Sequence, residues 1–265
     1  MLATPEEIAA WPTGSDGFVE AFAKGLAVIG AFGPEGGARS LADLARRTGL
    51  PRAGVRRLVL TLVELGLAES HDGRFALTPR VLRLGFAYLS TLGLREAAQP
   101  LIETLSREAG EVVAVSVLDG DELVYVARAE VHGVLRRSLT VGSRLPAFCT
   151  SMGRVLLSGL ADEALRSLLA KASRPAHTPR TVTDPETLET LIAAIRRTGW
   201  AMVSEELEIG ACGMAAAIRN SRGAVVAAVN LSTNLARHSE ADFVATFRDR
   251  LLAVAEAISR RLPPT

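Results

Sequence analysis

The sequence predicts an α+β protein with an N-terminal winged helix-turn-helix, a linker helix, and a C-terminal α/β domain built on an antiparallel sheet. Three observations support this fold class. Two helical segments meet at residues 49–51 and are followed by a hairpin pattern over 67–77. Beyond Pro100, helical and strand patterns are mixed and are joined by short connections. The chain has 265 residues, of which 48% are hydrophobic, and this is enough for two separate cores.

The N-terminal region begins with residues 1–17, which contain two prolines and two glycines but no apolar periodicity. We therefore expect a flexible tail there. Apolar residues at helical spacing predict a first helix over 18–31, and the glycine-rich stretch 33–37 ends it. The winged helix-turn-helix domain is expected to span 18–79.

The two helices of the helix-turn-helix follow. Residues 40–43 form a capping-box pattern that begins a short helix, and Gly49 ends it. A second helix over 51–65 buries one apolar stripe at helical spacing. Its other side, near the N-terminus, presents the residues that we expect to enter the major groove of double-stranded DNA: Arg52, Ala53, Gly54, Arg56 and Arg57.

Local charge supports this interpretation, although the whole chain has a formal net charge of only +1. Residues 39–83 contain nine arginines and four acids, so this segment carries +5. The Asp-Gly turn at 72–73 predicts a wing with Arg74 near its tip. Lys24 and Ser40 complete the candidate DNA contacts. The alternatives are a solvated basic helix face, a solvated charge at Lys24, and a helix cap at Ser40.

The linker helix is expected over residues 80–97. Apolar residues lie around most of its circumference between 82 and 92, so we expect it to be buried on more than one side. This pattern predicts a homodimer, or a dimer of dimers. Two copies would read a palindromic or repeated operator.

The C-terminal domain is assigned to residues 98–265. Helices are predicted over 100–109, 150–160, 162–170, a segment centred on Leu191, and 240–262. Strands are predicted over 112–118, 123–129, 134–141, 199–203, 214–218 and 224–231, and a polar loop over 174–183.

Taken in order, several segments of the chain resemble the IclR family of bacterial transcription regulators. They are residues 24–29, 40–45, 49–51, 55–58, 62–66, 141–146 and 149–157. The resemblance implies a GAF-like effector-binding fold for the second domain, where an effector is a small molecule that changes DNA binding. Residues 18–25 and 149–154 are most similar to the branch that regulates catabolism of aromatic acids through protocatechuate and β-ketoadipate.

The sequence also departs from the family pattern at two places. Ala53 and Gly54 stand where the family's recognition helix usually begins with Ser-Thr. Two hydroxyls that would contact phosphates or bases are missing, so the resemblance does not assign the operator sequence. Val203 and Ser204 stand where many members carry an acidic residue. A ligand that needs that carboxylate is therefore not expected.

The resemblance and the residue pattern together indicate a pocket for a small carboxylate or aromatic acid. Ser151, Met152, Asn230 and Ser232 match positions at which family members contact ligand. The helix start at Thr150 and the arginines at 128, 136 and 137 are candidate partners for a carboxylate. The complete set of expected ligand contacts is Arg128, Arg136, Arg137, Thr150, Ser151, Met152, Cys212, Gly213, Met214, Asn230 and Ser232, with 212–214 expected on a loop that faces Asn230.

Each of these residues has a structural alternative. The three arginines also fit solvated charges at strand ends. Cys149 and Cys212 fit small buried hydrophobic residues better than reactive thiols. Asn230 fits a satisfied buried amide, and Thr150 fits an N-cap.

Other classes of protein are disfavoured. The two cysteines lack metal-ligand or disulfide spacing and fit a reducing, cytoplasmic setting in which the protein is associated with the nucleoid. We expect no leader peptide, membrane span, cofactor or metal.

The residues that could support catalysis are not placed for it. The four histidines, at 71, 132, 177 and 238, lie away from candidate nucleophiles. Glu205, Glu206 and Glu208 fit a solvated strand end better than an acid/base cluster. An enzyme is therefore not expected. The remaining alternative is a second domain that only oligomerises, which the polar set at Ser151, Asn230 and Ser232 disfavours.

Overall fold

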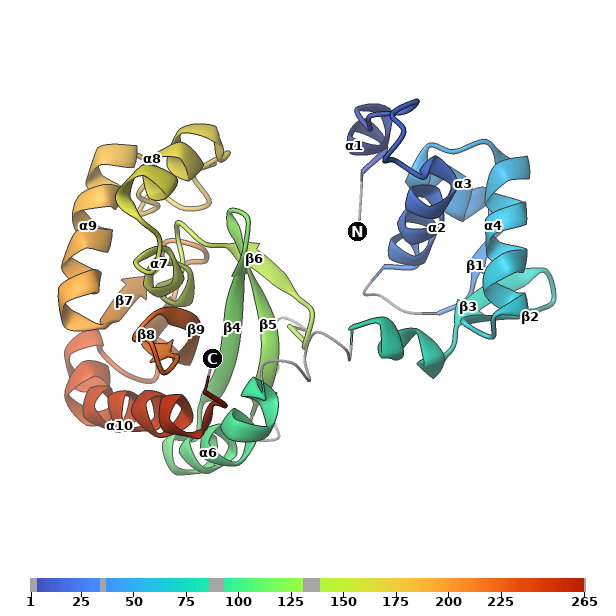
Figure 1. Ribbon diagram of the computed structural model, residues 1–265. Coiled ribbons are helices and arrows are strands. Elements are labelled where there is room, and N and C mark those ends of the chain that lie inside the picture. The colour runs from blue at the N-terminus through green and yellow to red at the C-terminus, as the bar shows by residue number, and fades with distance from the viewer. Residues whose placement is uncertain (1–3, 34–36, 86–92, 131–138, 265) are drawn as a thin grey trace. The chain divides into compact units, whose positions relative to one another are not determined.

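The computed structural model describes residues 4–33, 37–85, 93–130 and 139–264. The chain divides into two compact units, Met1–Tyr88 and Leu89–Thr265, and each is described by itself (Figure 1).

The N-terminal unit has a single core formed by three helices and a small sheet. Its helices are α1 (Pro5–Ala9), α2 (Glu20–Ala31), α3 (Leu41–Thr48) and α4 (Arg52–Glu64), and its strands are β1 (Arg39–Ser40), β2 (Ala68–His71) and β3 (Arg74–Leu77), followed by a 3-10 turn at Pro79–Val81. Val28 of α2, Leu44 of α3 and Val59 of α4 are completely buried against one another. The helix-turn-helix predicted from the sequence is present.

The turn between α3 and α4 depends on local backbone chemistry. The Ser40 hydroxyl accepts a hydrogen bond from the Asp43 amide and caps α3, and Gly49 ends α3 in the left-handed conformation. Pro51 then precedes α4, where its missing N–H costs nothing.

The wing is a β-hairpin, as predicted. Asp72 and Gly73 both have positive φ, 49° and 73°, which is the geometry of a type I′ turn. β2 pairs with β3, and the two-residue strand β1 adds to the other edge of β3 in antiparallel register. β1 is too short to leave a periodic signal and was not predicted.

The C-terminal unit is a six-stranded antiparallel sheet with helices on both faces (Figure 1). Its helices are α6 (Leu94–Ala109), α7 (Ser151–Leu157), α8 (Asp162–Lys171), α9 (Pro185–Thr198) and α10 (Glu240–Arg261). Its strands, in the spatial order β6-β5-β4-β9-β8-β7, are β6 (Arg144–Pro146), β5 (Glu122–Ala129), β4 (Val112–Asp119), β9 (Val225–Asn234), β8 (Ala211–Arg219) and β7 (Trp200–Ser204).

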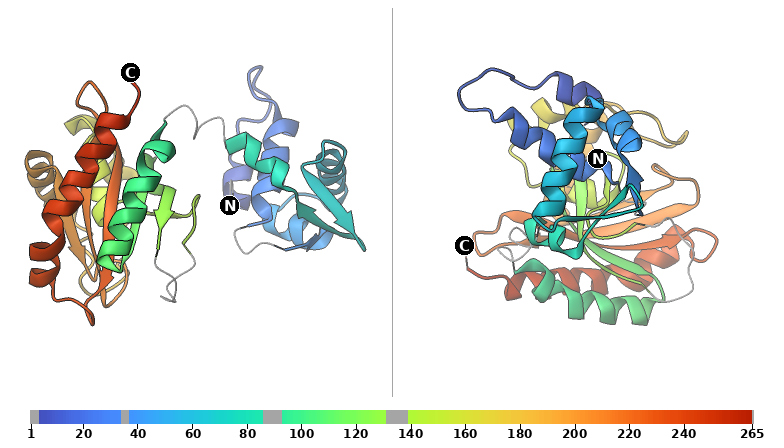
Figure 2. Two further views of the ribbon diagram at one scale, coloured as in Figure 1. Left: turned by 90° about the horizontal axis from the view of Figure 1, so that it is seen from below. Right: turned by 90° about the vertical axis from the view of Figure 1, so that its right-hand side faces the viewer.

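The two faces of this sheet are covered by different helices. Helices α6 and α10 lie side by side on one face, where Val113, Val229 and Phe243 are completely buried (Figure 2). Helix α7 covers the other face and packs on Ala114 and Ala228. Because side chains alternate between faces along a strand, odd-numbered residues of β4 and of β9 from Ala227 to Leu231 face α6 and α10, whereas even-numbered ones face α7.

The structure corrects several boundaries. Residues 5–9 form a helix rather than a flexible tail, because Thr4 and Glu7 complete a reciprocal capping box and Pro5 lies beside Gly49. No single helix spans 80–97, because Gly93 is left-handed with a φ of 55° and α6 begins at Leu94. The remaining linker residues 86–92, and 134–138 of the strand expected over 134–141, lie outside the described residues; 139–141 are not a strand.

Candidate functional site

The exposed side of α4 is the candidate DNA-binding surface. Val55 and Val59 are buried, whereas the residues predicted to face DNA are all exposed: Arg52, Ala53, Gly54, Arg56 and Arg57. Among the described residues, no acidic side chain pairs with Arg52, Arg56 or Arg57. These three guanidinium groups therefore remain available to phosphates and base edges.

The arginines of α3 differ, because they gather around one acid. Asp43 forms ion pairs with Arg39, Arg46 and Arg47, at 3.4 Å to Arg39 and 3.5 Å to Arg47. One carboxylate offsets only one of these three charges, so the cluster of Arg39 on β1 with Arg46 and Arg47 on α3 keeps a net charge of +2. It differs from α4 because its arginines are held by an acidic partner.

The other candidate DNA contacts have local partners. Ser40 is the cap of α3, and Lys24 pairs with Glu20 one helical turn earlier. Arg74 follows the wing turn, but its Nη1 donates to the carbonyl of Ala38 at 3.2 Å, so its side chain is held beside β1. We expect smaller roles for these three residues than for the arginines of α4.

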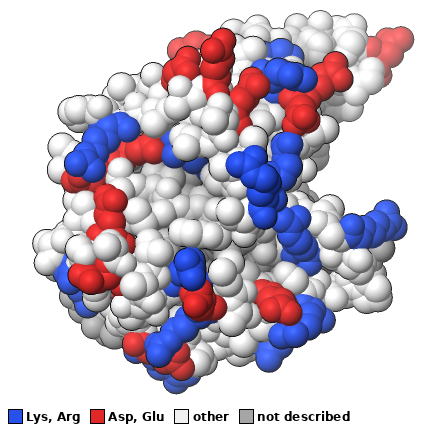
Figure 3. Space-filling model, turned by 90° about the vertical axis from the view of Figure 1, so that its left-hand side faces the viewer, with Lys and Arg blue, Asp and Glu red and all other residues white. Residues whose placement is uncertain are grey.

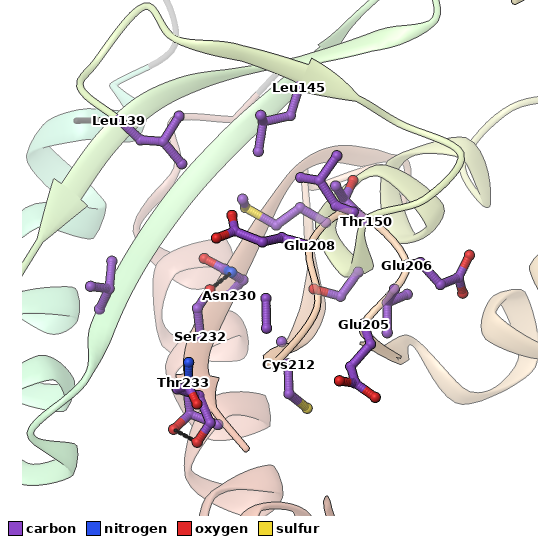
Figure 4. A pocket seen from close by; sticks show the side chains of 18 of the residues that line it. Leu139, Leu145, Thr150, Glu205, Glu206, Glu208, Cys212, Asn230, Ser232 and Thr233 are labelled. Atoms are coloured by element: carbon purple, nitrogen blue, oxygen red, sulfur yellow. Dashed lines mark hydrogen bonds between the residues drawn. The ribbon is translucent and has the colours of Figure 1, made fainter. Parts of the chain in front are cut away.

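The C-terminal unit contains a cavity of about 610 Å³ on the α7 side of its sheet. Its walls come from β5, the start of α7, the ends of β8 and β9, and the β7–β8 loop, which we define as residues 205–210. Figure 4 shows Leu139 and Leu145 on one side, Asn230 and Ser232 on another, and Glu208 directed into the space between them. A volume of this size suits a small organic ligand.

Polar groups converge at one end of the cavity. Asn230, which is 4% exposed, donates from Nδ2 to the Ser232 hydroxyl at 2.6 Å (Figure 4). Its Oδ1 is buried and has no hydrogen-bond partner among the described residues. The Asn230 amide is therefore only half satisfied, and a ligand that donates a hydrogen bond would complete it.

Gly213 keeps this end open. It pairs with Ser232 in the sheet, and a Cβ at this position would lie 3.1 Å from the Ser151 hydroxyl oxygen and 3.7 Å from that of Ser232. The absent side chain thus leaves the space in which Ser151, Ser232 and Asn230 converge.

Arg128 reaches the cavity because of a β-bulge in β5. Tyr125 lies opposite Ser116 and Ala127 lies opposite Val115, which leaves Val126 as the extra residue. Without the bulge, Tyr125 and Arg128 would face opposite sides of the sheet; with it, both line the cavity. Burial raises the pKa of Tyr125 to about 12, so its hydroxyl stays protonated.

The guanidinium of Arg128 is partly occupied. Nη1 donates to the carbonyl of Leu139, and Nη2 pairs with Glu130 at 2.9 Å. Only its buried Nε lacks a partner among the described residues. Within the described part of the chain, Nε is therefore the nitrogen of Arg128 that is wholly unpaired and can donate to a ligand, while Nη1 and Nη2 each already have a partner. Arg136 and Arg137 lie outside the described residues.

Thr150 is the N-cap of α7. Its hydroxyl accepts from the amide of Gly153 at 3.2 Å and donates to the carbonyl of Pro146 at 3.0 Å. Ser151 and Met152 follow it and line the cavity. Thr150 is thus an N-cap and also lines the cavity, so its predicted contact with a ligand stays a prediction.

The prediction for residues 212–214 needs two corrections. These residues lie in strand β8 rather than on a loop. Met214 is completely buried on the opposite face, against α6 and α10, and does not line the cavity. The Hα position of its neighbour Gly213 that a Cβ would occupy faces the cavity instead, because adjacent residues of a strand face opposite sides of the sheet.

The cysteines are buried thiols. Cys149 is inaccessible and Cys212 is 3% exposed, and both line the cavity. Burial raises the pKa of Cys149 to about 12, with a further contribution from the Glu206 carboxylate, and raises that of Cys212 to about 11. Neither is a thiolate near neutral pH.

The three glutamates at the end of β7 do not behave as one solvated group. Glu206 is 7% exposed and pairs with Arg154 of α7, which corrects the expectation of a solvated strand end. Glu205 pairs with Arg180 at 3.2 Å. In Figure 4, the side chains of Glu205 and Glu206 extend away from the space beside Asn230, and only that of Glu208 enters it.

The histidines have varied surroundings. His71 ends β2, His177 stacks on Phe148, and His238 packs against two phenylalanines of α10; His132 lies outside the described residues. Within the described ranges, no group of three or more potential ligands is placed to hold a metal ion.

Over much of the face in Figure 3, blue and red side chains are interspersed, but several blue side chains lie together right of the centre of the view. Of the helices that the structure describes, none combines the length and apolarity that crossing a membrane requires.

Comparison with known proteins gives matches to both units. A family model for the IclR helix-turn-helix domain matches residues 21–72, and one for the bacterial transcriptional regulator IclR C-terminal domain matches 86–260. The Pca regulon regulatory protein of Pseudomonas putida is 40% identical over 263 residues, which cover 99% of this chain and 90% of the relative.

Two solved structures extend the match. A chain described as a transcriptional regulator from Rhodococcus sp. RHA1 is 46% identical, with a TM-score of 0.82, over 92% of this chain and 98% of that one. An IclR homologue from Microbacterium hydrocarbonoxydans, solved in complex with 4-hydroxybenzoate, is 29% identical, with a TM-score of 0.79, over 91% of this chain and 98% of that one.

Proposed function

Since this chain belongs to the IclR family of bacterial transcriptional regulators, we propose that it is a regulator that senses a small aromatic acid and controls the operon for its catabolism. The named relatives are regulators of transcription rather than enzymes. The proposed setting is the cytoplasm, where the protein meets its operator.

One observation in the cavity carries the choice of ligand. The space is mostly apolar but ends in the hydroxyls of Ser151 and Ser232 and the half-satisfied amide of Asn230. An aromatic ring suits the apolar part, near Leu139 and Leu145. A phenol hydroxyl on that ring suits the polar end, because it both donates and accepts hydrogen bonds, whereas an ionised carboxylate only accepts them. The homologue with bound 4-hydroxybenzoate supports the same class of ligand.

DNA recognition is assigned to α4. Arg52, Arg56 and Arg57 are exposed near the helix N-terminus, where a recognition helix meets base edges, and none of the described acidic side chains pairs with them. We propose a homodimer, or a dimer of dimers, in which two α4 helices read half-sites roughly one DNA turn apart. Counterion release would make the affinity fall steeply with salt.

Regulation requires that the effector bind two arrangements of the protein with unequal affinity. A ligand that fills the space between the β7–β8 loop and β9 would favour one packing of the C-terminal unit. That preference would then change the affinity of the α4 surface for operator.

The test is a panel of acids measured in two ways. Thermal unfolding with benzoate, 4-hydroxybenzoate, 3,4-dihydroxybenzoate and adipate reports binding, because a ligand of the folded state raises its apparent stability. Fluorescence anisotropy with a fragment that the protein selects from random DNA reports operator affinity. We expect at least one hydroxybenzoate to change both quantities. If every acid left both unchanged, the proposal would be wrong.

A further inference from the structure

A buried ion pair lies beside the cavity and joins two of its walls. Nη2 of Arg154 contacts Oε2 of Glu206 at 2.7 Å, and the two side chains are only 5% and 8% exposed. Arg154 belongs to α7, whose first residues Ser151 and Met152 line the cavity. Glu206 belongs to the β7–β8 loop, which lines the cavity from the other side.

The Glu206 carboxylate also fixes a third segment. The same Oε2 accepts a hydrogen bond from the amide of Val182 at 2.9 Å. The main-chain carbonyl of Glu206 accepts from the hydroxyl of Thr181 at 2.6 Å. One acidic residue therefore connects the β7–β8 loop with α7 and with the polar loop over 174–183.

Arg154 is itself held in one orientation. Its Nε donates to the carbonyl of Phe148 at 2.8 Å, so the guanidinium bridges the segment before α7 and the β7–β8 loop. Planar, multidentate contacts of this kind fix direction as well as distance. A lysine would supply the charge without both contacts.

The backbone of the loop depends on such anchoring. Glu205 has a φ of 58°, a left-handed conformation that is unfavourable for a residue with a side chain. Its Oε1 accepts from the amide of Gly210 at 2.9 Å, and its amide donates to the carbonyl of Ala211 at 2.7 Å. The loop is thus closed on itself, and Glu206 attaches the closed loop to α7.

Stability alone does not explain a buried ion pair here. Removing two charges from water is costly, and well-packed apolar residues often replace such a pair without loss of stability. What such residues do not reproduce is the directional contact of a guanidinium with a carboxylate. The pair therefore fits a positional role better than a stabilising one.

We propose that the Arg154–Glu206 ion pair positions the β7–β8 loop against α7 and thereby sets the effector affinity of the cavity, without touching the effector. This inference rests on the proposed function of the cavity. Arg154 and Glu206 are positioning residues: Arg154 is not part of the cavity lining, and the Glu206 carboxylate is directed away from the polar end (Figure 4).

The main test is the double variant Arg154→Met/Glu206→Leu in the full-length protein. We expect its unfolding midpoint to stay close to that of the wild type. Amide exchange at Gly210 and Ala211 should rise about tenfold, because the loop opens locally more often. The Kd for 4-hydroxybenzoate should rise about tenfold, because part of the binding energy is then used to order the loop. Operator affinity without ligand should not change.

The matched control is Arg196→Met. Arg196 also contacts the α7 region, through Nε to the carbonyl of Ser158 and Nη1 to Asp162 at 2.6 Å, but it lies outside the cavity lining. It should leave loop exchange and the Kd unchanged. Glu206→Gln keeps the size of the side chain and an acceptor for Val182, and it provides the same readouts if the double variant fails to fold.

The inference is overturned if a folded variant keeps wild-type exchange at Gly210 and Ala211, or if the Kd is unchanged despite faster exchange. It is also overturned if exchange rises equally across the whole C-terminal unit, which would indicate a merely structural role. If wild-type protein binds none of the benzoates, the proposed function fails. The exchange measurement then still decides whether the pair positions the loop.

Discussion

The two candidate sites of this protein are built in opposite ways. The candidate DNA-binding surface consists of exposed side chains on one helix, α4, whose apolar residues face inward. The cavity consists of buried atoms that come from several strands, a helix start and a loop. Substitutions on the surface should therefore change function with little effect on folding. Substitutions in the cavity should change both.

The cavity also holds polar atoms that folding leaves unsatisfied. Asn230 Oδ1 and Arg128 Nε are buried without a hydrogen-bond partner among the described residues, and such atoms cost stability. Arg52, Arg56 and Arg57, by contrast, are exposed to solvent, so in the absence of DNA they do not lower the free energy of unfolding. The contrast between the two sites suggests experiments in which stability and binding are measured separately.

The largest effect is expected for Gly153→Ala. A Cβ at this position would lie 2.2 Å from both the Cα and the carbonyl oxygen of Ala147, so the backbone between β6 and α7 would have to move. We expect the free energy of unfolding of the C-terminal unit to fall by about 4 kcal/mol or more, which is within the range of severe steric substitutions. Urea unfolding monitored separately for each unit measures this loss.

The matched control for this prediction is Gly54→Ala in α4. Nothing lies within 4 Å of a Cβ there, so the change should stabilise the helix by about 0.5–1 kcal/mol. The comparison fails if the two alanines have similar effects on the units that contain them.

Arg57→Ala should weaken operator binding by about 1–3 kcal/mol if the guanidinium reads a base, and should lower the salt dependence by about one ion if it contacts a phosphate. The unfolding free energy should not change, because the side chain is exposed and has no acidic partner within the described part of the chain. Binding titrations at several salt concentrations distinguish the two outcomes.

Arg46→Ala is the control for charge alone, since Arg46 is 75% exposed but pairs with Asp43. Its effect on operator affinity should be smaller. An equal loss for both arginines would argue against α4 as the recognition helix.

The same contrast explains how much the sequence could predict. Both helices of the helix-turn-helix, the wing turn, and α10 were expected within a residue or two, because periodicity, caps and Asp-Gly turns are local signals. Cavity residues depend instead on register. Met214 differs from Gly213 by one position, and one position decides the face of the sheet.

Other parts of the cavity left no signal in the sequence. The bulge at Val126 brings Tyr125 and Arg128 to the same face, and nothing in the sequence of β5 indicates it. The partner of Glu206 is 52 residues away, at Arg154, so the glutamates after β7 resembled an ordinary solvated strand end. Long-range contacts of this kind have no periodicity to reveal them.

Asn230→Leu should separate stability from ligand binding within the cavity. The substitution removes the unsatisfied Oδ1 at similar volume but also removes the Nδ2 donor to the half-buried Ser232 hydroxyl, so the unfolding free energy should change by less than about 1 kcal/mol. Affinity for a hydroxybenzoate should fall about tenfold to a hundredfold, because the ligand loses a buried hydrogen-bond partner. Calorimetric titration and urea unfolding provide the two numbers.

Ser232→Ala should affect stability differently from Asn230→Leu. It removes the acceptor of Asn230 Nδ2 and leaves a further buried group unpaired, so it should lower stability as well as affinity. If Asn230→Leu were the more destabilising of the two variants, the unpaired Oδ1 of Asn230 would not lower the stability of the wild type as we infer.

The smallest effect concerns the thiols, and it appears only at alkaline pH. Burial raises the pKa of Cys149 to about 12 and that of Cys212 to about 11. A cysteine in the unfolded chain has the ordinary pKa of about 8.5. A raised folded pKa contributes stability that is fully present below the unfolded pKa and is lost as pH rises toward the folded value. The C-terminal unit should therefore become less stable above about pH 8.5. The N-terminal unit contains no cysteine, so its unfolding should show no such loss from thiol ionisation.

Iodoacetamide labelling near neutral pH tests the burial of the same thiols. Both should react slowly in the folded protein, Cys149 more slowly than Cys212. A bound hydroxybenzoate should slow both reactions further, because both cysteines line the cavity. Rapid labelling of folded protein would show that the cavity opens far more often than its buried walls imply.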